Sequence, residues 1–97
     1  MVVGCLQLRL NLAENHSLKG KRAVVRRVTD RVRNKFNVAI AEVSTQDDHQ
    51  VATIGVVCVS NDAKQCHAVL MKVLNFVEDL HMDAEIVDVE TEIIQAL

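Results

Sequence analysis

Apolar and polar residues alternate at the start of the chain. Every even position from residue 6 to residue 12 is a leucine, and polar side chains stand between them. This period of two is typical of a strand with one buried face. The next apolar residues recur every three or four positions as far as Phe36, after Ser17, a residue type favoured at helix starts. The pattern predicts a strand over residues 2–12 and a helix of about five turns that ends at Asn37.

Four more elements follow from similar patterns. Two runs rich in β-branched residues, Val38–Val43 and Val51–Val59, are joined by a polar connection typical of a hairpin. The second run is apolar on both faces, which predicts a central strand. Capping residues at 60–62 introduce a second helix that reaches Leu80. Alternation of valine and isoleucine with carboxylates then predicts a last strand over residues 87–93.

The predicted order is β-α-β-β-α-β, the ferredoxin-like arrangement, in which two helices cover one face of a four-stranded antiparallel sheet. We therefore expect an α+β fold and a single domain over residues 1–97, a length that suits one hydrophobic core. The other sheet face is uncovered, and Val3, Cys5 and part of the Val51–Val59 strand are candidates to line it. Such a face predicts a partner surface, most simply for a homodimer.

Positive charge is concentrated in the first predicted helix. Residues 19–35 carry eight of the eleven Lys and Arg residues and one acid, Asp30, so the net charge of this stretch is +7. The rest of the chain carries three cations and twelve acids, a net charge of -9. The overall charge of -2 therefore conceals a dipole whose positive side attracts polyanions.

On a helical projection most of these cations fall into two stripes beside the apolar face: Lys19, Arg22, Arg26 and Arg33 in the first, and Arg27, Arg31 and Lys35 in the second. Asp30 is within reach of Arg26 and Arg27, which leaves most cations without a partner on their own helix. The cations are therefore available either to solvent or to a ligand.

The first turn of this helix contains two lysines, although the helix dipole disfavours cations there. An anion on the free N–H groups beside Ser17 would remove the conflict. The residues predicted to contact phosphate first are Ser17, Lys19, Lys21, Arg22 and Arg26. The full set of predicted RNA- or phosphate-binding residues also contains Arg27, Arg31, Arg33 and Lys35.

The aromatic content limits the kind of nucleic acid that could bind. The chain has no Trp or Tyr, and its two phenylalanines fall in predicted helices, so base stacking on the strands is excluded. We expect contacts to the phosphates of structured RNA or a ribosomal subunit, and no readout of DNA sequence. The alternative is a protein-interaction or homo-oligomerisation module whose basic helix docks on an acidic protein surface, including its own subunit's acidic strand.

No motif predicts catalysis, a metal or a cofactor. Acylphosphatases share this topology, but they use a phosphate loop with an Arg after the first strand and an Asn on the second. Here the loop at residues 11–17 has no glycine, and Glu42 stands on the second strand. Asp47, Asp48 and His49 are adjacent in a turn and cannot all face one metal ion. We therefore expect a non-enzymatic protein.

The cysteines and the N-terminus indicate the compartment. Cys5, Cys58 and Cys66 are an odd number without paired spacing, which suits reduced thiols. The N-terminal residues resemble neither a signal peptide nor a membrane span. We therefore expect a cytoplasmic protein without membrane association.

Five short motifs occur along the chain: Ser17-Leu18-Lys19-x-Lys21-Arg22, Arg33-Asn34-x-Phe36-Asn37-Val38, Ala41-Glu42-Val43, Gln46-Asp47 and Val59-Ser60-Asn61-Asp62. Together they resemble the YlxP-like family of small bacterial proteins, a domain of unknown function. The resemblance implies a ferredoxin-like fold, a bacterial cytoplasmic origin, and a gene that commonly neighbours those for ribosome-binding factor A and translation initiation factor 2. That neighbourhood suggests work on the ribosome or RNA, and the family has no established catalytic residues. Gly20 departs from the family pattern, which often has a charged residue there, usually Glu.

Overall fold

All six predicted elements occur, in the predicted order, in the computed structural model, which describes all 97 residues. They are β1 (Val2–Asn11), α1 (Leu18–Lys35), β2 (Ala39–Ser44), β3 (Val51–Ser60), α2 (Ala63–Glu78) and β4 (Glu85–Gln95). No helix has both the length and the apolar character needed to cross a membrane. The predicted α+β, ferredoxin-like class is confirmed.

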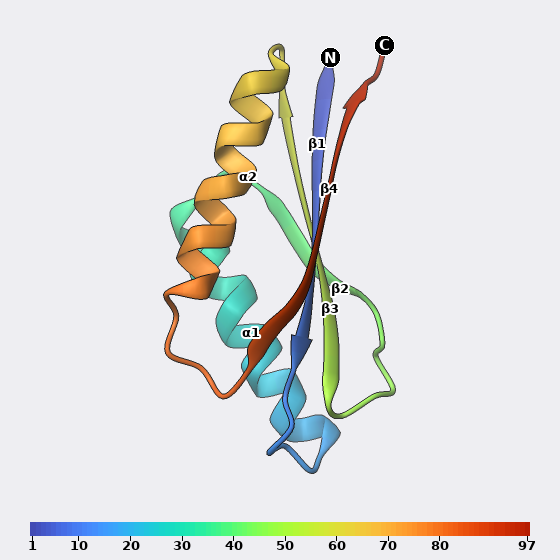
Figure 1. Cartoon of the computed structure of the whole chain (residues 1–97), viewed down its shortest axis with the longest axis vertical. Helices are drawn as coiled ribbons and strands as arrows, with labels where there is room; N and C mark the ends of the chain where they lie inside the picture. Colours follow the sequence, from blue (N-terminus) through green and yellow to red (C-terminus); the bar gives the residue numbers. More distant parts are fainter.

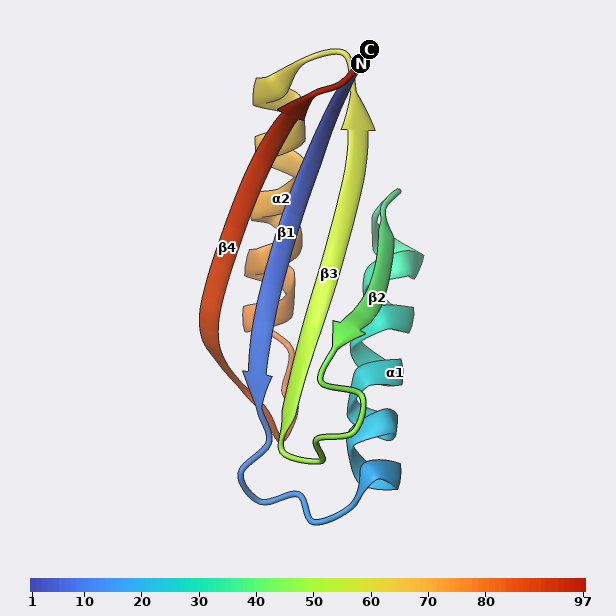
Figure 2. The ribbon, with the colours of Figure 1, turned by 90° about the vertical axis from the view of Figure 1, so that its right-hand side faces the viewer.

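The four strands form one antiparallel sheet in the order β2-β3-β1-β4. Both helices lie on the same side of this sheet, which Figure 1 shows edge-on. The other face is open and is turned toward the viewer in Figure 2, where β4 and the short β2 form the two edges. The predicted central position of β3 is confirmed, since it lies between β2 and β1.

Three predicted boundaries need correction, the first being that α2 ends at Glu78, with Asp79 as its cap, and does not reach Leu80. Helix α1 ends at Lys35, and its C-terminal cap is Phe36 rather than Asn37. Phe36 has extended backbone angles, and its N–H donates to the carbonyl of Val32 at 2.8 Å, so the chain leaves the helix there. Strand β4 is longer at both ends than the predicted residues 87–93, because pairing with β1 continues beyond the alternating segment.

The side of the sheet that faces the helices holds the even-numbered residues of β1 and β3. Leu6 pairs with Val56 and Leu8 with Ile54, and all four side chains are buried. Helix α2 covers them with four buried residues at helical spacing: Cys66, Leu70, Val73 and Val77. The alternating apolar residues of β1 and the helically spaced apolar residues of α2 therefore pack together in one core.

The odd-numbered residues of β1 point to the open face, as predicted for Val3 and Cys5. Val3 pairs with Val59 on one side and Ile94 on the other. Cys5 pairs with Val57, and Val57, Val59 and Ile94 are exposed. One end of the open face is therefore an apolar strip.

At the other end of the sheet, hydrogen bonds join the loop after β1 to the loop between β2 and β3. The N–H of Leu12 donates to the carbonyl of Gln50 at 2.8 Å, and the side-chain amide of Gln50 donates to the carbonyl of Ala13 at 3.3 Å. The side-chain amide of Asn15 donates to the carbonyl of His49 at 2.6 Å. These bonds place the start of α1 beside the loop between β2 and β3.

Candidate nucleic-acid interface

Helix α1 packs on the sheet with its apolar side, so its two stripes of cations lie on opposite flanks. Val28 and Val32 are buried beneath the helix. On one flank Arg33 Nη2 donates to the carbonyl of Ile40 in β2 at 3.0 Å. On the other flank Lys35 Nζ lies 4.8 Å from the ring centre of Phe76 in α2. The first stripe therefore follows the β2 edge, and the second faces α2.

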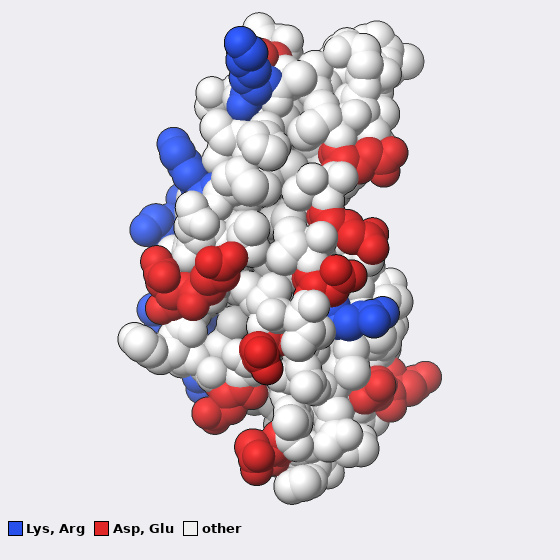
Figure 3. Space-filling model, viewed as in Figure 1, with Lys and Arg blue, Asp and Glu red and all other residues white.

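Five cations of α1 are exposed and make no side-chain ion pair, hydrogen bond or cation–π contact within the chain: Lys19, Arg22, Arg26, Arg27 and Arg31. The chain contains only two ion pairs, and neither involves one of these five residues. The carboxylates gather elsewhere, and Figure 3 shows a row of them down the right-hand side, over β4. The surface of α1 therefore carries a local excess of unneutralised positive charge.

Asp30 pairs with Arg33, not with Arg26 or Arg27 as predicted. The distance from Arg33 Nη1 to Asp30 Oδ1 is 3.5 Å, and both side chains are more than half exposed. The same guanidinium also donates, through Nη2, to the carbonyl of Ile40 at 3.0 Å. Arg33 is thus partly occupied within the fold.

The prediction that Lys21 contacts phosphate is wrong. Its side chain is 0% exposed, although it lies in the first turn of α1. The ammonium donates to Glu42 Oε2 at 2.8 Å and to the carbonyls of Thr45 and Val51 at 2.5 and 3.2 Å. The carbonyl of Gln46 is a fourth acceptor, at 3.4 Å, so all three donors of the ammonium are used within the fold. Lys21 therefore stabilises the fold and cannot reach an external ligand.

Thr45 completes this buried polar cluster. Its φ angle is 68°, an unusual value for a β-branched residue that requires support from the surrounding structure. Its hydroxyl donates to Glu42 Oε2 at 3.2 Å and accepts from the N–H of Thr53 at 3.0 Å. No buried side-chain nitrogen or oxygen in the chain lacks a partner. The charge of Lys21 in the first turn is therefore balanced from within, and no bound anion is needed to explain it.

Ser17 is the N-terminal cap of α1, as predicted. Its hydroxyl accepts from the N–H of Gly20 at 3.0 Å. The amide of Asn15 donates to the carbonyl of Ser17 at 2.7 Å and lies across the first turn, so a Cβ at Gly20 would collide with Asn15 Oδ1. The helix start is therefore covered by the chain itself, and the exposed cations further along α1 are better placed to meet a ligand.

The spacing of Lys21 could have shown that its side chain points toward the sheet. It stands three, four and seven residues before Val24, Val25 and Val28, the positions that share one face of a helix. Glu42 likewise stands two residues after Ile40, so the two share a strand face that points to the helices. The spacing of both residues therefore indicated an inward orientation, which is unexpected for charged side chains.

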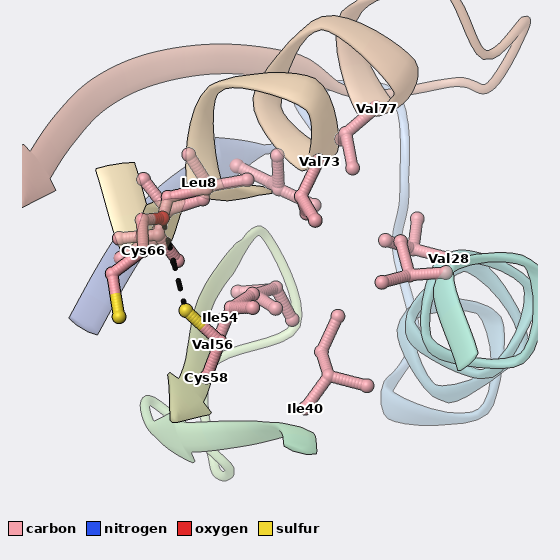
Figure 4. Packing of buried hydrophobic residues seen from close by; sticks show 14 of the residues in the cluster. Leu8, Val28, Ile40, Ile54, Val56, Cys58, Cys66, Val73 and Val77 are labelled. Carbon is pink, nitrogen blue, oxygen red and sulfur yellow. Dashed lines mark hydrogen bonds between the residues drawn. The ribbon is translucent and has the colours of Figure 1, made fainter. Parts of the chain in front are cut away.

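Cys5 and Cys58 lie on opposite faces of the sheet, Cys5 on the open face and Cys58 on the helix side. Cys58 packs against Cys66 among buried residues (Figure 4), and its thiol donates to the carbonyl of Cys66 at 3.8 Å. Burial, and then the neighbouring thiol of Cys66, raise the pKa of Cys58. Both thiols are buried in the core, out of reach of solvent.

The polar turn between β2 and β3 is exposed, as predicted. Asp48 Oδ1 accepts from the N–H groups of Gln50 and Val51 at 2.8 and 3.2 Å, so this carboxylate shapes the turn. Asp47 and His49 point to solvent. No three His, Cys, Asp or Glu side chains in the chain gather in a way that could hold a metal ion.

Comparison with known proteins identifies the family. The model of the family described as "Protein of unknown function (DUF503)" matches residues 3–91. The chain belongs to this family. Uncharacterized protein YlxP of Bacillus subtilis (strain 168) is 38% identical over 77 residues, which cover 79% of this chain and 84% of the relative. The YlxP-like resemblance that the motifs indicate is thereby confirmed.

In this YlxP-like protein, three of the motifs meet around one side chain. Lys21 comes from the first motif, Glu42 from the third, and the carbonyl of Gln46 in the fourth lies 3.4 Å from Lys21 Nζ. These segments are up to 25 residues apart in the sequence. Part of the motif pattern therefore describes a structural junction, and the exposed cations are a separate feature of the same helix.

Proposed function

We propose that this chain is a non-enzymatic RNA- or ribosome-associated protein of the bacterial cytoplasm, with a role in ribosome maturation or translation, that binds the phosphates of structured RNA through α1. The observation that carries this proposal is the set of five exposed, unpaired cations on α1. Their Cα atoms span about 18 Å along the helix, at 1.5 Å per residue from Lys19 to Arg31. A surface of this length can meet several phosphates at once.

A contribution to folding stability is a weak explanation for the presence of these five cations on α1. An exposed ion pair contributes about 0–1 kcal/mol, and these five residues make none within the chain. Within each stripe, Arg22 and Arg26 and likewise Arg27 and Arg31 are four residues apart, so their Cβ atoms are about 6 Å apart. Two parallel rows of guanidinium groups suit two lines of phosphates, which favours a folded RNA over an isolated strand.

Among the predicted contacts, Lys19, Arg22, Arg26, Arg27 and Arg31 form the proposed binding surface. Arg33 and Lys35 extend it at the C-terminal end, where each is partly engaged by a neighbour, and Ser17 is a cap at the other end. Lys21 is excluded by its burial. The open sheet face has no aromatic residue for base stacking, so the proposed contacts are to backbone and shape.

The test is affinity for ribosomal RNA and for small ribosomal subunits at salt concentrations from about 50 to 300 mM. We expect log affinity to fall linearly with log salt, with a slope of about -0.7 to -0.9 per phosphate contact. A triple variant with Lys19, Arg22 and Arg26 changed to Gln should reduce the slope by about 2 units. The absence of binding at about 50 mM salt would refute the proposal.

A matched control separates this surface from net charge alone. Changing Arg9, Lys64 and Lys72 to Gln removes the same charge from other elements, because these are the three cations outside residues 19–35. We expect this control to keep most of the affinity. Equal losses in the two triple variants would contradict a binding surface on α1.

The second candidate is a protein-interaction module in which α1 docks on an acidic surface, including β4 of a second copy. It is favoured by the unpaired carboxylates of β4. The open sheet face offers a second route to a homodimer, through its apolar strip. Sedimentation without RNA tests both routes: a salt-sensitive dimer indicates charge pairing, a salt-resistant dimer indicates the apolar face, and the mass of one chain at micromolar concentration removes both.

A further inference from the structure

The outer edge of β4 is a row of backbone groups without partners. Strand β4 lies at the end of the sheet, pairs only with β1, and has eleven residues. No side chain or loop in the chain donates to or accepts from the backbone of residues 85–95 on its outer side. A long free edge of this kind is a template for an added strand.

The hydrogen-bond pattern identifies the free groups. The N–H of Ala96 donates to the carbonyl of Met1 at 2.8 Å, so the even-numbered residues of β4 from Asp88 onward bond to β1. Bonding direction alternates along an antiparallel strand. The free N–H and C=O groups are therefore those of the odd-numbered residues that follow the irregularity near Val87: Val89, Thr91, Ile93 and Gln95.

The opposite edge of the sheet is protected. In β2, the carbonyl of Ile40 accepts from Arg33 Nη2 at 3.0 Å, and the carbonyl of Glu42 accepts from the side-chain amide of Gln46 at 3.1 Å. Side chains of the chain itself thus occupy the outward carbonyls of this edge. The two edges therefore differ: two outward carbonyls of β2 are occupied by side chains, whereas the outer side of β4 has no such contact.

The side chains of β4 alternate in the same way as its backbone. Asp88, Glu90 and Glu92 pair with Arg9, Gln7 and Cys5, so they lie on the open face. The odd positions face the helix side, and Val89 and Ile93 remain 39% and 38% exposed because α2 does not cover the edge strand fully. None of the three carboxylates has an ion-pair partner.

We propose that the β4 edge binds an extended basic segment of another protein, in which Lys or Arg alternates with apolar residues. The added strand would bond to the backbone of Val89, Thr91 and Ile93. Its cations would then stand opposite Asp88, Glu90 and Glu92, at a cross-strand distance of about 4.5–5.5 Å between Cβ atoms. Its apolar side chains would cover Val89 and Ile93. This interaction does not depend on RNA binding by α1, which lies on another face.

The same charges disfavour a second copy as the occupant. Two β4 strands paired about their centres would place carboxylates of one chain opposite carboxylates of the other. Like charges directly opposite each other are destabilising. A basic partner removes this repulsion and neutralises three unpaired acids.

The probe is the peptide acetyl-Lys-Val-Lys-Thr-Lys-Val-Lys-amide, added to the full chain at up to about 1 mM, with amide hydrogen exchange measured by NMR. We expect exchange at Val89, Thr91 and Ile93 to slow by at least about tenfold, because these N–H groups gain acceptors. The N–H groups of Glu90 and Glu92 already bond to β1 and should change little. A peptide of the same composition with its lysines in one block should produce no such alternation.

Variants test the two parts of the site. Changing Glu90 and Glu92 to Gln should weaken peptide binding by about 2- to 30-fold. Changing Glu78 and Asp79 at the end of α2 to Gln and Asn removes the same charge and should leave binding unchanged. Thr91→Pro removes one outward N–H without disturbing the bonds to β1 and should abolish binding.

Three results would overturn the proposal. The first is equal slowing of exchange at odd and even positions, since that indicates general stabilisation rather than strand addition. The second is equal binding of the alternating and blocked peptides, which indicates charge attraction alone. The third is protection of Val89, Thr91 and Ile93 without peptide in a sample that sediments as a dimer, which would assign the edge to a second copy.

Discussion

The burial of Lys21 makes a quantitative prediction that separates its structural role from ligand binding. In Lys21→Met the side chain keeps its length but loses three hydrogen bonds, and Glu42, whose side chain is only 13% exposed, loses its partner. Breaking a buried ion pair by removing one partner costs about 3–5 kcal/mol. Because solvent reaches Glu42 to some extent, we expect a loss of about 3 kcal/mol in the free energy of unfolding.

The assay is urea denaturation followed by circular dichroism, with linear extrapolation to water. A loss of about 3 kcal/mol in a domain of this size corresponds to a melting temperature lower by about 12–24 °C, with little change in the slope of the urea transition. Lys19→Met is the matched control, since it removes an exposed lysine two residues away and should change stability by about 0.5 kcal/mol or less.

A double variant tests the cause. Lys21→Met combined with Glu42→Leu replaces the ion pair by apolar side chains and should recover most of the lost stability, because a buried pair can often be exchanged for hydrophobic residues at small cost. The reasoning is refuted if Lys21→Met is as stable as Lys19→Met. It is also refuted if Lys21→Met keeps full stability but loses affinity for RNA, because Lys21 would then be a ligand contact after all.

Three further predictions concern close contacts and thiols. Gly20→Ala should destabilise the chain by about 1 kcal/mol, because the new Cβ displaces the Asn15 amide. In an Asn15→Ala background the same change should stabilise α1 by up to about 1 kcal/mol. The urea midpoint of each variant, compared with that of its parent, gives the sign of the effect. At pH 8 a thiol reagent should label Cys5 quickly and the two core cysteines only after unfolding, because burial raises the pKa of Cys58 and lowers its thiolate fraction; rapid labelling of all three in the folded state would contradict this. Gly4→Ala should cost about 1–3 kcal/mol in thermal unfolding, since a Cβ there lies 3.0 Å from Cys58 Sγ, and Cys58→Ala in the same background should restore part of the loss.

The sequence predicted the fold well because its hydrophobic periods are regular. The leucines of β1 alternate without exception, and the apolar residues of α2 keep helical spacing to Val77. Each segment therefore carries its own evidence for strand or helix, and the order of segments restricts the topology. The boundaries were less certain, because pairing with β1 extends β4 beyond its alternating stretch.

The candidate surface was harder to predict, because the state of a charged side chain depends on residues far away in sequence. Lys21 is buried only because Glu42 and the carbonyls of a distant loop supply acceptors, and one of those carbonyls belongs to Thr45 in an unusual backbone conformation. Local spacing shows which way Lys21 points. It does not show whether hydrogen-bond acceptors are present at that place in the fold. A count of charges also treats all eight cations of residues 19–35 as equally exposed.

The unequal edges of the sheet have a consequence for stoichiometry. Arg33 and Gln46 occupy the outward carbonyls of β2, so a strand can add there only after both hydrogen bonds are released. Each chain therefore has one sheet edge, β4, to which a strand can add directly. A complex formed through this edge contains the chain and one partner, and further chains cannot add edge to edge in a row.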